Sequence, residues 1–378
     1  MSKKIKFETL AIQSTQIPDK TTGAVATPIN LSTTFERETD GSYRSGFVYS
    51  RSENPNRQLL EKSIALLENG AVGLAFSSGM AATTALFNTL KPGEEILLPN
   101  DAYYATKVMA KDLFQSKGIK VREVVMSNIK SVKKAIRKNT ALVWLETPSN
   151  PQLNISDIGK ISKLAHKAGA ICAVDNTWPS PVLQQPLEHG ADVVIHSTSK
   201  YFGGHSDVLG GCLVIKKSGQ LSEKLKNIQT LTGGVPSPFE CWLVTRGIKT
   251  LYVRVKQQTK NAAKLASYLQ THPGIEKVNY PGLKSHPHHK VAKKQMKGGF
   301  GAMLSIQVKG NAQNAMNLTG RLKLFTTATS LGGVESLIEH RKSIEGPESP
   351  TPDNLLRISV GLENIDDLIA DWKQALGY

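Results

Sequence analysis

The chain has 378 residues, 39% of them hydrophobic, which is enough for one large domain and a smaller one. Its formal net charge is +16, but the basic residues are mainly lysines dispersed over predicted helix surfaces, so we expect no nucleic-acid partner. No apolar run approaches the roughly 18 residues that a membrane span needs, and three scattered cysteines predict reduced thiols in a cytoplasmic protein.

Residues 1–55 are polar and have little periodicity. They are too poor in apolar residues to fold alone, so they should form an arm that lies across its own body or across a partner subunit. The chain then enters a helix, in which Leu60, Ile64 and Leu67 share one face and after which Gly70 follows.

Between residues 72 and 215 short apolar runs alternate with helix-length segments. The runs are 72–76, 95–98, 121–125, 141–145, 171–174, 193–195 and 211–215. This alternation, with continuously apolar strands, predicts an α/β fold in which helices cover both faces of a mostly parallel sheet. Ligands of such sheets bind at the carboxyl ends of strands, so functional side chains should follow the strands directly.

The segment 192–211 is the most informative of these strand ends. A buried strand runs into Ser197, Ser199 and Lys200, and four glycines follow. A lysine amine in this place can bond to the aldehyde of a cofactor, and the neighbouring hydroxyls can bind a phosphate. The alternative is a glycine-rich turn that carries an exposed lysine.

Three other strand ends carry candidate ligand-binding groups. Ser77-Ser78-Gly79-Met80 opens a helix, where backbone N–H groups make an anion site unless the segment is only an ordinary helix cap. Asp175 follows a buried strand and needs a cationic partner, either a pyridinium N–H or an arginine. Tyr103 could stack on a flat ring, or it could be a core aromatic residue.

After residue 245 the pattern changes to a long helical segment at 240–270, short strands at 302–308 and 356–360, and helices near 311–321 and 365–376. This pattern predicts a smaller α/β domain. The predicted division is therefore an arm at 1–55, a large domain at 56–245 and a small domain at 246–378.

Three further groups in the sequence are candidates for a functional role. Arg357 lies alone in an apolar strand, which suits bidentate capture of a carboxylate or a structural salt bridge. The cluster His286-Pro287-His288-His289 lacks the spacing of metal ligands, so we expect a surface turn and no metal site. His205 is expected to be a loop residue that holds a hydrogen bond.

Taken together, these groups call for a ligand with a phosphate, a ring nitrogen and an aldehyde, and pyridoxal 5′-phosphate (PLP) has all three. The sequence also resembles the Cys/Met-metabolism family of PLP enzymes, the cystathionine β-lyase, γ-lyase and γ-synthase group, over nearly its whole length. The motifs that carry the resemblance are Tyr49-Ser50-Arg51 with Asn54-Pro55, Ser77-Ser78-Gly79-Met80-Ala81, Glu146-Thr147-Pro148-Ser149-Asn150-Pro151, Val174-Asp175-Asn176-Thr177, Ser199-Lys200-Tyr201, Ser330-Leu331-Gly332-Gly333 and Leu356-Arg357-Ile358-Ser359.

The resemblance implies the aspartate-aminotransferase-like fold (fold type I) and a homotetramer built of active dimers. It assigns catalysis to Lys200, which would bond to the cofactor, and to Tyr103, which would also stack on the cofactor ring. The other implied cofactor-binding residues are Gly79, Met80, Asp175, Thr177, Ser197 and Ser199, together with Tyr49 and Arg51 from the neighbouring subunit. The implied substrate-binding residues are Asn150, Ser330 and Arg357, and the substrate is a small amino acid.

Departures from the family pattern bear on the substrate. Thr329 stands where γ-synthases and many γ-lyases carry a glutamate, and Ala105 follows Tyr104 where methionine γ-lyases typically have a cysteine. Trp178 is shared with bacterial β-lyases, although Leu331 replaces the aromatic residue usual there. We therefore predict β-elimination of cystathionine to homocysteine, pyruvate and ammonia. The alternatives are γ-elimination, γ-synthase activity and, more distantly, a basic nucleic-acid-binding protein or a non-lytic regulator that binds the cofactor.

Overall fold

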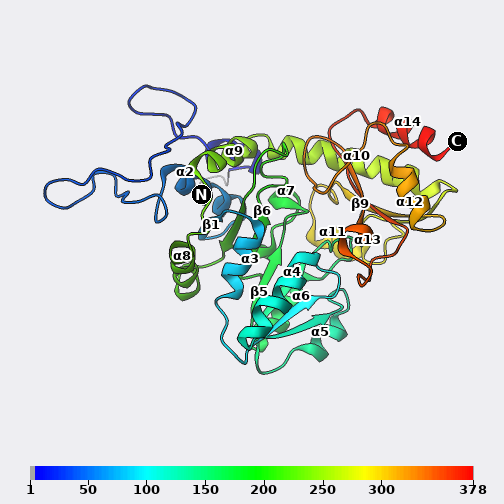
Figure 1. The fold of residues 1–378 in the computed structure, drawn as a ribbon, viewed down its shortest axis with the longest axis horizontal. Helices are drawn as coiled ribbons and strands as arrows, with labels where there is room; N and C mark the ends of the chain where they lie inside the picture. The colour runs from blue at the N-terminus through cyan, green and yellow to red at the C-terminus, as the bar shows by residue number, and fades with distance from the viewer. Residues whose placement is uncertain (1–4, 378) are drawn as a thin grey trace.

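The computed structural model describes residues 5–377, which form two sheets with helices packed around them (Figure 1). The larger sheet has seven strands in the order β1-β7-β6-β5-β4-β2-β3. Its strands are β1 (Val72–Phe76), β2 (Glu95–Pro99), β3 (Lys120–Val124), β4 (Thr140–Glu146), β5 (Ile171–Asp175), β6 (Val193–Ser197) and β7 (Gly211–Ile215). Each of them overlaps one of the predicted apolar runs.

Most neighbouring strands of this sheet are parallel, as predicted. Strand β2 pairs in parallel with β3 and β4, β4 with β5, and β5 with β6, whereas β7 is antiparallel to both β6 and β1. Strand β1 therefore runs in the same direction as β6. The carboxyl ends of β1, β4, β5 and β6 consequently meet at one edge, which is where ligands bind in sheets of this kind.

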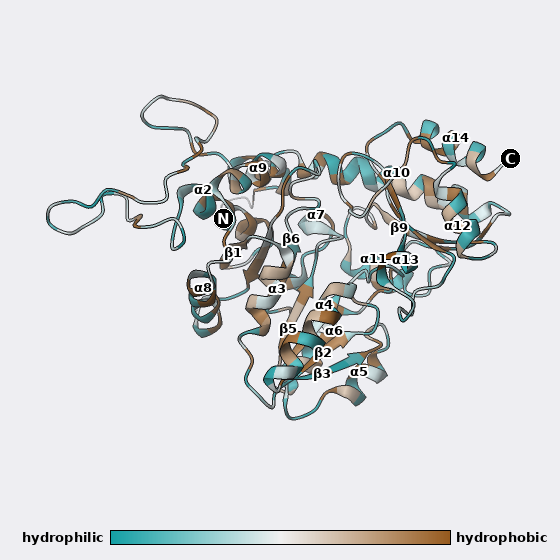
Figure 2. Ribbon diagram, viewed as in Figure 1, coloured by the Kyte–Doolittle hydropathy of each residue, from teal (hydrophilic) through white to brown (hydrophobic). Residues whose placement is uncertain are grey.

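Helices cover both faces of the larger sheet. They are α2 (Pro55–Leu67), α3 (Gly79–Phe87), α4 (Tyr104–Met109), α5 (Ile129–Ala135), α6 (Ile158–Lys167), α7 (Ser180–Leu183), α8 (Gln220–Thr232) and α9 (Pro238–Ile248). Side chains alternate along each strand, so one face packs against α3 and α8 and the other against α2, α6 and α9. In Figure 2 the central strands are mostly brown, in agreement with two buried faces.

The second sheet has five strands in the order β10-β11-β12-β9-β8. The strands are β8 (Ile275–Asn279), β9 (Met303–Val308), β10 (Thr326–Thr327), β11 (Leu337–His340) and β12 (Leu355–Ser359). The helices of this part are α10 (Leu251–Thr271), α11 (His289–Gln295), α12 (Ala312–Thr319), α13 (Arg341–Glu345) and α14 (Ile365–Leu376). The predicted helical segment 240–270 is in fact two helices, α9 and α10, and the predicted domain boundary at residue 245 falls inside α9.

The N-terminal arm differs from the expectation at its start. Helix α1 (Phe7–Gln13) was not predicted, yet Ala11 is buried and Phe7 packs beside Tyr252 of α10. Phe7, Leu10 and Ala11 are spaced i, i+3, i+4, a pattern too short to stand out from the polar residues around it. Beyond α1 the arm runs out from the body in two long loops (Figure 1). Residues 1–4 of the predicted arm lie outside the described residues.

The histidine-rich turn also differs from the expectation. His286 is buried, and its Nε2 atom lies 3.1 Å from the carbonyl oxygen of Leu153. His286 therefore packs onto the loop after β4, while its neighbours Ser285 and Pro287 are exposed, as expected of a surface turn. His205 forms the expected loop contact, with Nδ1 2.9 Å from the oxygen of Gly203.

Two general properties of the fold bear on the early expectations. Within residues 5–377 no helix combines the length and the apolarity that a bilayer span requires. The predicted free thiols are confirmed, because all three cysteines (Cys172, Cys212 and Cys241) are unpaired and buried.

Candidate active site

A cavity of about 300 Å³ lies where the carboxyl ends of the larger sheet face the second sheet. Its lining contains nearly all the site residues that the sequence predicts. These are Gly79, Met80, Tyr103, Asn150, Asp175, Thr177, Ser197, Ser199, Lys200, Ser330 and Arg357. Ser330 and Arg357 come from the second sheet and its loops, so the cavity lies between the two parts of the chain.

Tyr49 and Arg51 do not line this cavity. Tyr49 is 41% exposed and bridges to Thr34 on the arm, and Arg51 donates from Nη1 to the carbonyl oxygen of Thr230 at 2.7 Å. One chain therefore does not bring them to the other candidates. Their expected role at a neighbouring subunit's site stays a prediction.

One end of the cavity is built to receive an anion. Ser78 caps helix α3 and accepts from the backbone N–H of Ala81 at 3.0 Å. A Cβ atom on Gly79 would lie 3.1 Å from the Cβ of Ser197, so the glycine lets this helix start close to the end of β6. The hydroxyl of Ser199 bonds both backbone groups of Gly210 and so fixes the loop. Helix N-terminal N–H groups beside hydroxyls suit a phosphate.

Two acids lie side by side at the ends of β4 and β5, where Glu146 is paired with Asp175 in the strand register. Burial, and then the charge of Asp175, raise the pKa of Glu146 well above its ordinary value. Burial also raises the pKa of Asp175, and the donors of Thr177 and the charge of His196 only partly oppose this rise. Both acids are therefore costly to ionise in the chain alone, and a cation placed beside them would favour their charged forms.

Glu146 also positions the loop that carries Tyr103. Its Oε2 atom accepts from the backbone N–H of Tyr103 at 2.7 Å. Tyr103 stands at the start of α4 and is 40% exposed, so its ring borders the cavity instead of packing in the core. Of the two interpretations that the sequence left open for this residue, the structure excludes the core aromatic.

Lys200 lies at the centre of the cavity wall. Its Nζ atom is 3.1 Å from the hydroxyl oxygen of Ser330. Burial, and then the charge of Arg357, lower the pKa of this amine, while Glu339 opposes the shift. A lysine with a lowered pKa is neutral at a lower pH than an exposed one, which suits both bonding to an aldehyde and accepting a proton.

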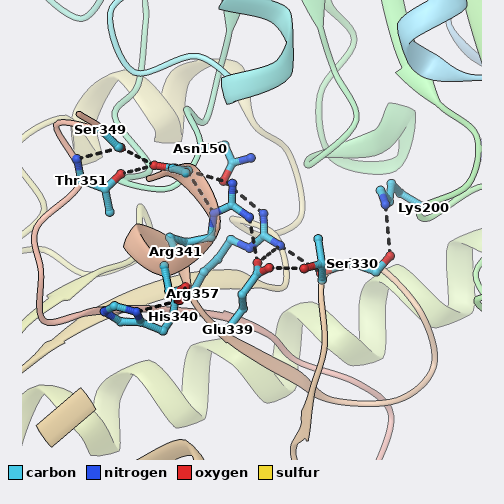
Figure 3. A network of polar contacts seen from close by, with 12 residues as sticks. Asn150, Lys200, Ser330, Glu339, His340, Arg341, Ser349, Thr351 and Arg357 are labelled. Carbon is cyan, nitrogen blue, oxygen red and sulfur yellow. Dashed lines mark hydrogen bonds and ion pairs between the residues drawn. The ribbon is translucent and has the colours of Figure 1, made fainter. Parts of the chain in front are cut away.

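Arg357 on β12 adjoins Lys200 through Ser330 (Figure 3). Its Nη2 atom donates to the carbonyl oxygen of Ser330 at 3.3 Å, and its Nη1 atom donates to Oδ1 of Asn150 at 3.2 Å. Burial, and then the charge of Arg341, lower its pKa to about 10, so the guanidinium is charged at neutral pH. A charged guanidinium beside a reactive amine is suited to hold a carboxylate.

Three charged residues of this wall were not anticipated from the sequence: Glu339, Arg341 and Glu345. Glu339 accepts from Arg357 at 2.6 Å and from Arg341 at 2.9 Å, and it also bonds the hydroxyl of Thr329. The sequence signal was present as a Glu-x-Arg-x-x-x-Glu pattern running from the end of β11 into α13. Its meaning depends on the pairing of Glu339 with Arg357 across β11 and β12, which the sequence does not reveal.

The described residues contain no group of three or more histidine, cysteine, aspartate or glutamate side chains that could hold a metal ion. The arrangement instead offers an anion site, an acid facing the cavity, a half-buried amine and an arginine. These are the elements that a phosphate-bearing, nitrogen-containing aldehyde cofactor would use.

Comparisons with known proteins point in the same direction. A family model described as "Cys/Met metabolism PLP-dependent enzyme" matches residues 8–377. The chain is 46% identical to cystathionine gamma-synthase of Mycobacterium tuberculosis over 375 residues, covering 98% of this chain and 96% of the relative. It is 43% identical to cystathionine gamma-lyase of Bacillus subtilis over 380 residues, covering 98% and 99%.

A third relative and a solved structure complete the comparison. Cystathionine beta-lyase of Coxiella burnetii is 40% identical over 384 residues, with 99% of each chain covered. The crystal structure of metB from Corynebacterium glutamicum superposes with a TM-score of 0.96 at 45% identity, covering 99% of this chain and 98% of that one. The likeness extends over both sheets and is not limited to the cavity.

Proposed function

The chain belongs to the Cys/Met-metabolism family of PLP-dependent enzymes, and from this premise we propose that it cleaves the carbon–sulfur bond of cystathionine by β-elimination. The predicted family and cofactor are thereby confirmed, and the relatives name the group of activities: cystathionine gamma-synthase, gamma-lyase and beta-lyase. The choice among these activities is the part that we propose.

The residues present fit PLP on three independent counts. The start of α3 with Ser197 and Ser199 is a cradle for its phosphate, and Gly79 keeps this cradle open. Asp175 is a carboxyl that lines the cavity, and a cationic ring nitrogen beside it would favour its ionised form despite the rise in its pKa. Lys200 supplies an amine with a lowered pKa for its aldehyde.

When bound, PLP supplies an electron sink for the carbanion that forms at the substrate's Cα atom. The chain's own residues do the rest. Arg357 holds the α-carboxylate, and Ser330 and Asn150 orient the guanidinium. This places Cα beside Lys200, whose neutral amine accepts the Cα proton. Beside the cationic ring Asp175 would be ionised, and its charge would favour the protonated form of the ring nitrogen.

One observation carries the preference for β-elimination. A leaving group on Cβ departs after a single proton has been removed, whereas γ-chemistry also removes a proton from Cβ, and a glutamate before Ser330 could hold the distal amine of the substrate. At position 329, where γ-synthases of the resembled family carry a glutamate, the hydroxyl of Thr329 bonds to Glu339, and Glu339 already contacts Arg341 and Arg357. The wall above Lys200 thus offers a hydroxyl in place of a free carboxylate.

The test is a product assay on L-cystathionine with the purified, PLP-loaded enzyme. β-Elimination yields homocysteine, pyruvate and ammonia in equal amounts, and chromatography distinguishes pyruvate from 2-oxobutyrate. Cysteine with 2-oxobutyrate as the main product would establish γ-elimination instead. Absence of any keto acid would overturn the proposed lyase activity.

Cystathionine γ-synthase is the second candidate, because relatives that are 46% identical carry that name. It predicts that the enzyme joins cysteine to an O-acylhomoserine and forms cystathionine. Measuring both reactions with one preparation compares the candidates directly. A larger kcat/KM for the synthesis would replace β-elimination as the proposal.

We also propose that the protein is a cytoplasmic homotetramer of active dimers. Several apolar or aromatic side chains of the arm are exposed in the single chain, namely Ile17, Val25, Leu31, Val48 and Tyr49. Their exposure supports an assembly in which a second subunit covers them, and such an assembly would bring Tyr49 and Arg51 to the neighbouring cavity. Sedimentation equilibrium tests it, and a monomer would contradict it.

Substitution Arg357→Lys is expected to raise KM for cystathionine by roughly 10- to 100-fold, because a lysine keeps the charge but loses the paired N–H donors. The value of kcat should fall much less, since the α-carboxylate is bound in both the ground state and the transition state. The matched control is the exposed Arg321→Lys. An unchanged KM would mean that the carboxylate binds elsewhere.

A further inference from the structure

The polar contacts of the cavity wall form a row that leads away from Lys200. From the amine the row passes through Ser330 to Arg357, then through Glu339 to Arg341 on α13. Figure 3 shows this order, with Lys200 at one end and Thr351 at the other. Arg357 is therefore the arginine nearer the reacting amine, and Arg341 lies one step farther out.

Arg341 is held in one orientation by charged partners. Its Nε and Nη2 atoms donate to Oε1 of Glu345 at 3.1 and 2.8 Å, and its Nη1 atom donates to Oε2 of Glu339 at 2.9 Å. Although burial lowers the pKa of Arg341, these two carboxylates raise it, so the guanidinium remains charged. The other oxygen of Glu345 accepts from Ser349 and Thr351, which fixes the pair.

These contacts do not exhaust the donors of Arg341. A guanidinium carries two N–H bonds on each terminal nitrogen, and the contacts above use one on Nη1 and one on Nη2. A further N–H on each terminal nitrogen is left for a ligand in the cavity that this side chain lines. Paired N–H donors of this kind match the two oxygens of a carboxylate.

Within the described part of the chain, the cationic side chains that line the cavity are Lys200, Arg341 and Arg357. The proposed function commits Lys200 to the cofactor and Arg357 to the α-carboxylate. We propose that Arg341 binds a second, distal carboxylate, so that the preferred substrates are amino acids with an acid group at the far end. This inference rests on the proposed function, since it takes the inner two cations as already used.

A distal carboxylate could come from two kinds of substrate. In a thioether such as cystathionine it belongs to the second amino-acid half, and in an O-acylhomoserine such as the O-succinyl compound it ends the acyl chain. Both place an acid several bonds beyond the scissile bond. Cysteine, methionine and O-acetylhomoserine have no such group and would leave Arg341 without its ligand.

The experiment compares Arg341→Met and Arg341→Lys with the wild-type holoenzyme on matched substrates. The ratio of kcat/KM for cystathionine to that for S-ethylcysteine should fall about 10- to 100-fold in Arg341→Met, since a charge-assisted hydrogen-bond pair is lost. Arg341→Lys should recover part of the ratio. The ratio of kcat/KM for O-succinylhomoserine to that for O-acetylhomoserine is measured in the same variants. If only this second ratio falls, the distal carboxylate that Arg341 binds is that of the acyl chain.

A binding measurement keeps the test independent of turnover. Calorimetric titration should show 2-aminoadipate, which has a distal carboxylate, binding about tenfold tighter than norleucine, and Arg341→Met should abolish this preference. If Arg341→Met lost affinity equally for 2-aminoadipate and norleucine, Arg341 would only support Arg357 through Glu339. That result would overturn the inference. If wild type leaves cystathionine intact but still prefers 2-aminoadipate through Arg341, the proposed lyase activity fails while the inference stands.

Discussion

Replacing Lys200 with alanine is expected to lower kcat for cystathionine by about 10³-fold or more, because one amine both accepts the Cα proton and bonds to the cofactor. The lysine is half-buried beside Ser330 and Arg357, and partial burial, then Arg357, lower its pKa. No other lysine lines the described cavity. Water or added amine would have to do both tasks at lower effective concentration.

Two readouts separate this chemical loss from a loss of folding. Reduction of the wild-type holoenzyme with borohydride, followed by peptide mapping, should find the cofactor attached at residue 200, whereas the alanine variant should release its cofactor on denaturation. The control is the exposed Lys217→Ala, which should keep its kcat. Retention of more than a tenth of wild-type turnover in Lys200→Ala would end the mechanism.

The sequence predicts the strand-end residues well because they depend on local order along the chain. In a parallel sheet the carboxyl ends of strands meet at one edge, so Gly79, Asp175 and Lys200 had to be near one another once the strands were identified. The structure brings all three to one cavity. The anion site follows in the same way from the start of a helix directly after a strand.

Contacts between distant segments could not be derived in that way. Glu68 and His196 are separated by 128 positions, yet their side chains are buried and lie 2.6 Å apart behind the Asp175 strand. Arg357 was predicted as a carboxylate ligand, but its contacts with Glu339 depend on which strands pair and in which register. Neither the pairing of the strands nor its register can be derived from the identity of these residues alone.

The structure of the N-terminal arm could not be predicted from its sequence for a different reason. Its apolar residues are too few to predict a helix, and α1 forms because Ala11 packs against the body. Tyr49 and Arg51 could be assigned to a neighbouring subunit only through the family resemblance. Neither residue lines the cavity of its own chain, so this assignment stays a prediction.

Substitution Asp175→Asn is expected to lower kcat by about 10- to 10³-fold. A carboxylate beside a cationic ring raises the ring's pKa by roughly one to three units, each worth about 1.4 kcal/mol, and asparagine removes this charge. The exposed Asp112→Asn is the matched control and should keep wild-type kcat. A variant with more than half of the wild-type kcat would show that Asp175 does not hold the ring nitrogen.

The same substitution should have the opposite effect on the stability of the cofactor-free protein. Burial raises the pKa of Asp175 in the folded chain, so the folded state favours the protonated acid and loses stability as pH rises above the ordinary value of 3.8. Asparagine cannot ionise and avoids this loss. The urea midpoint of cofactor-free Asp175→Asn should therefore exceed that of wild type at pH 7.5, and the difference should shrink toward pH 4. A lower midpoint at pH 7.5 would mean that the carboxylate is stabilised by the protein itself and is not held ready for a cationic ligand.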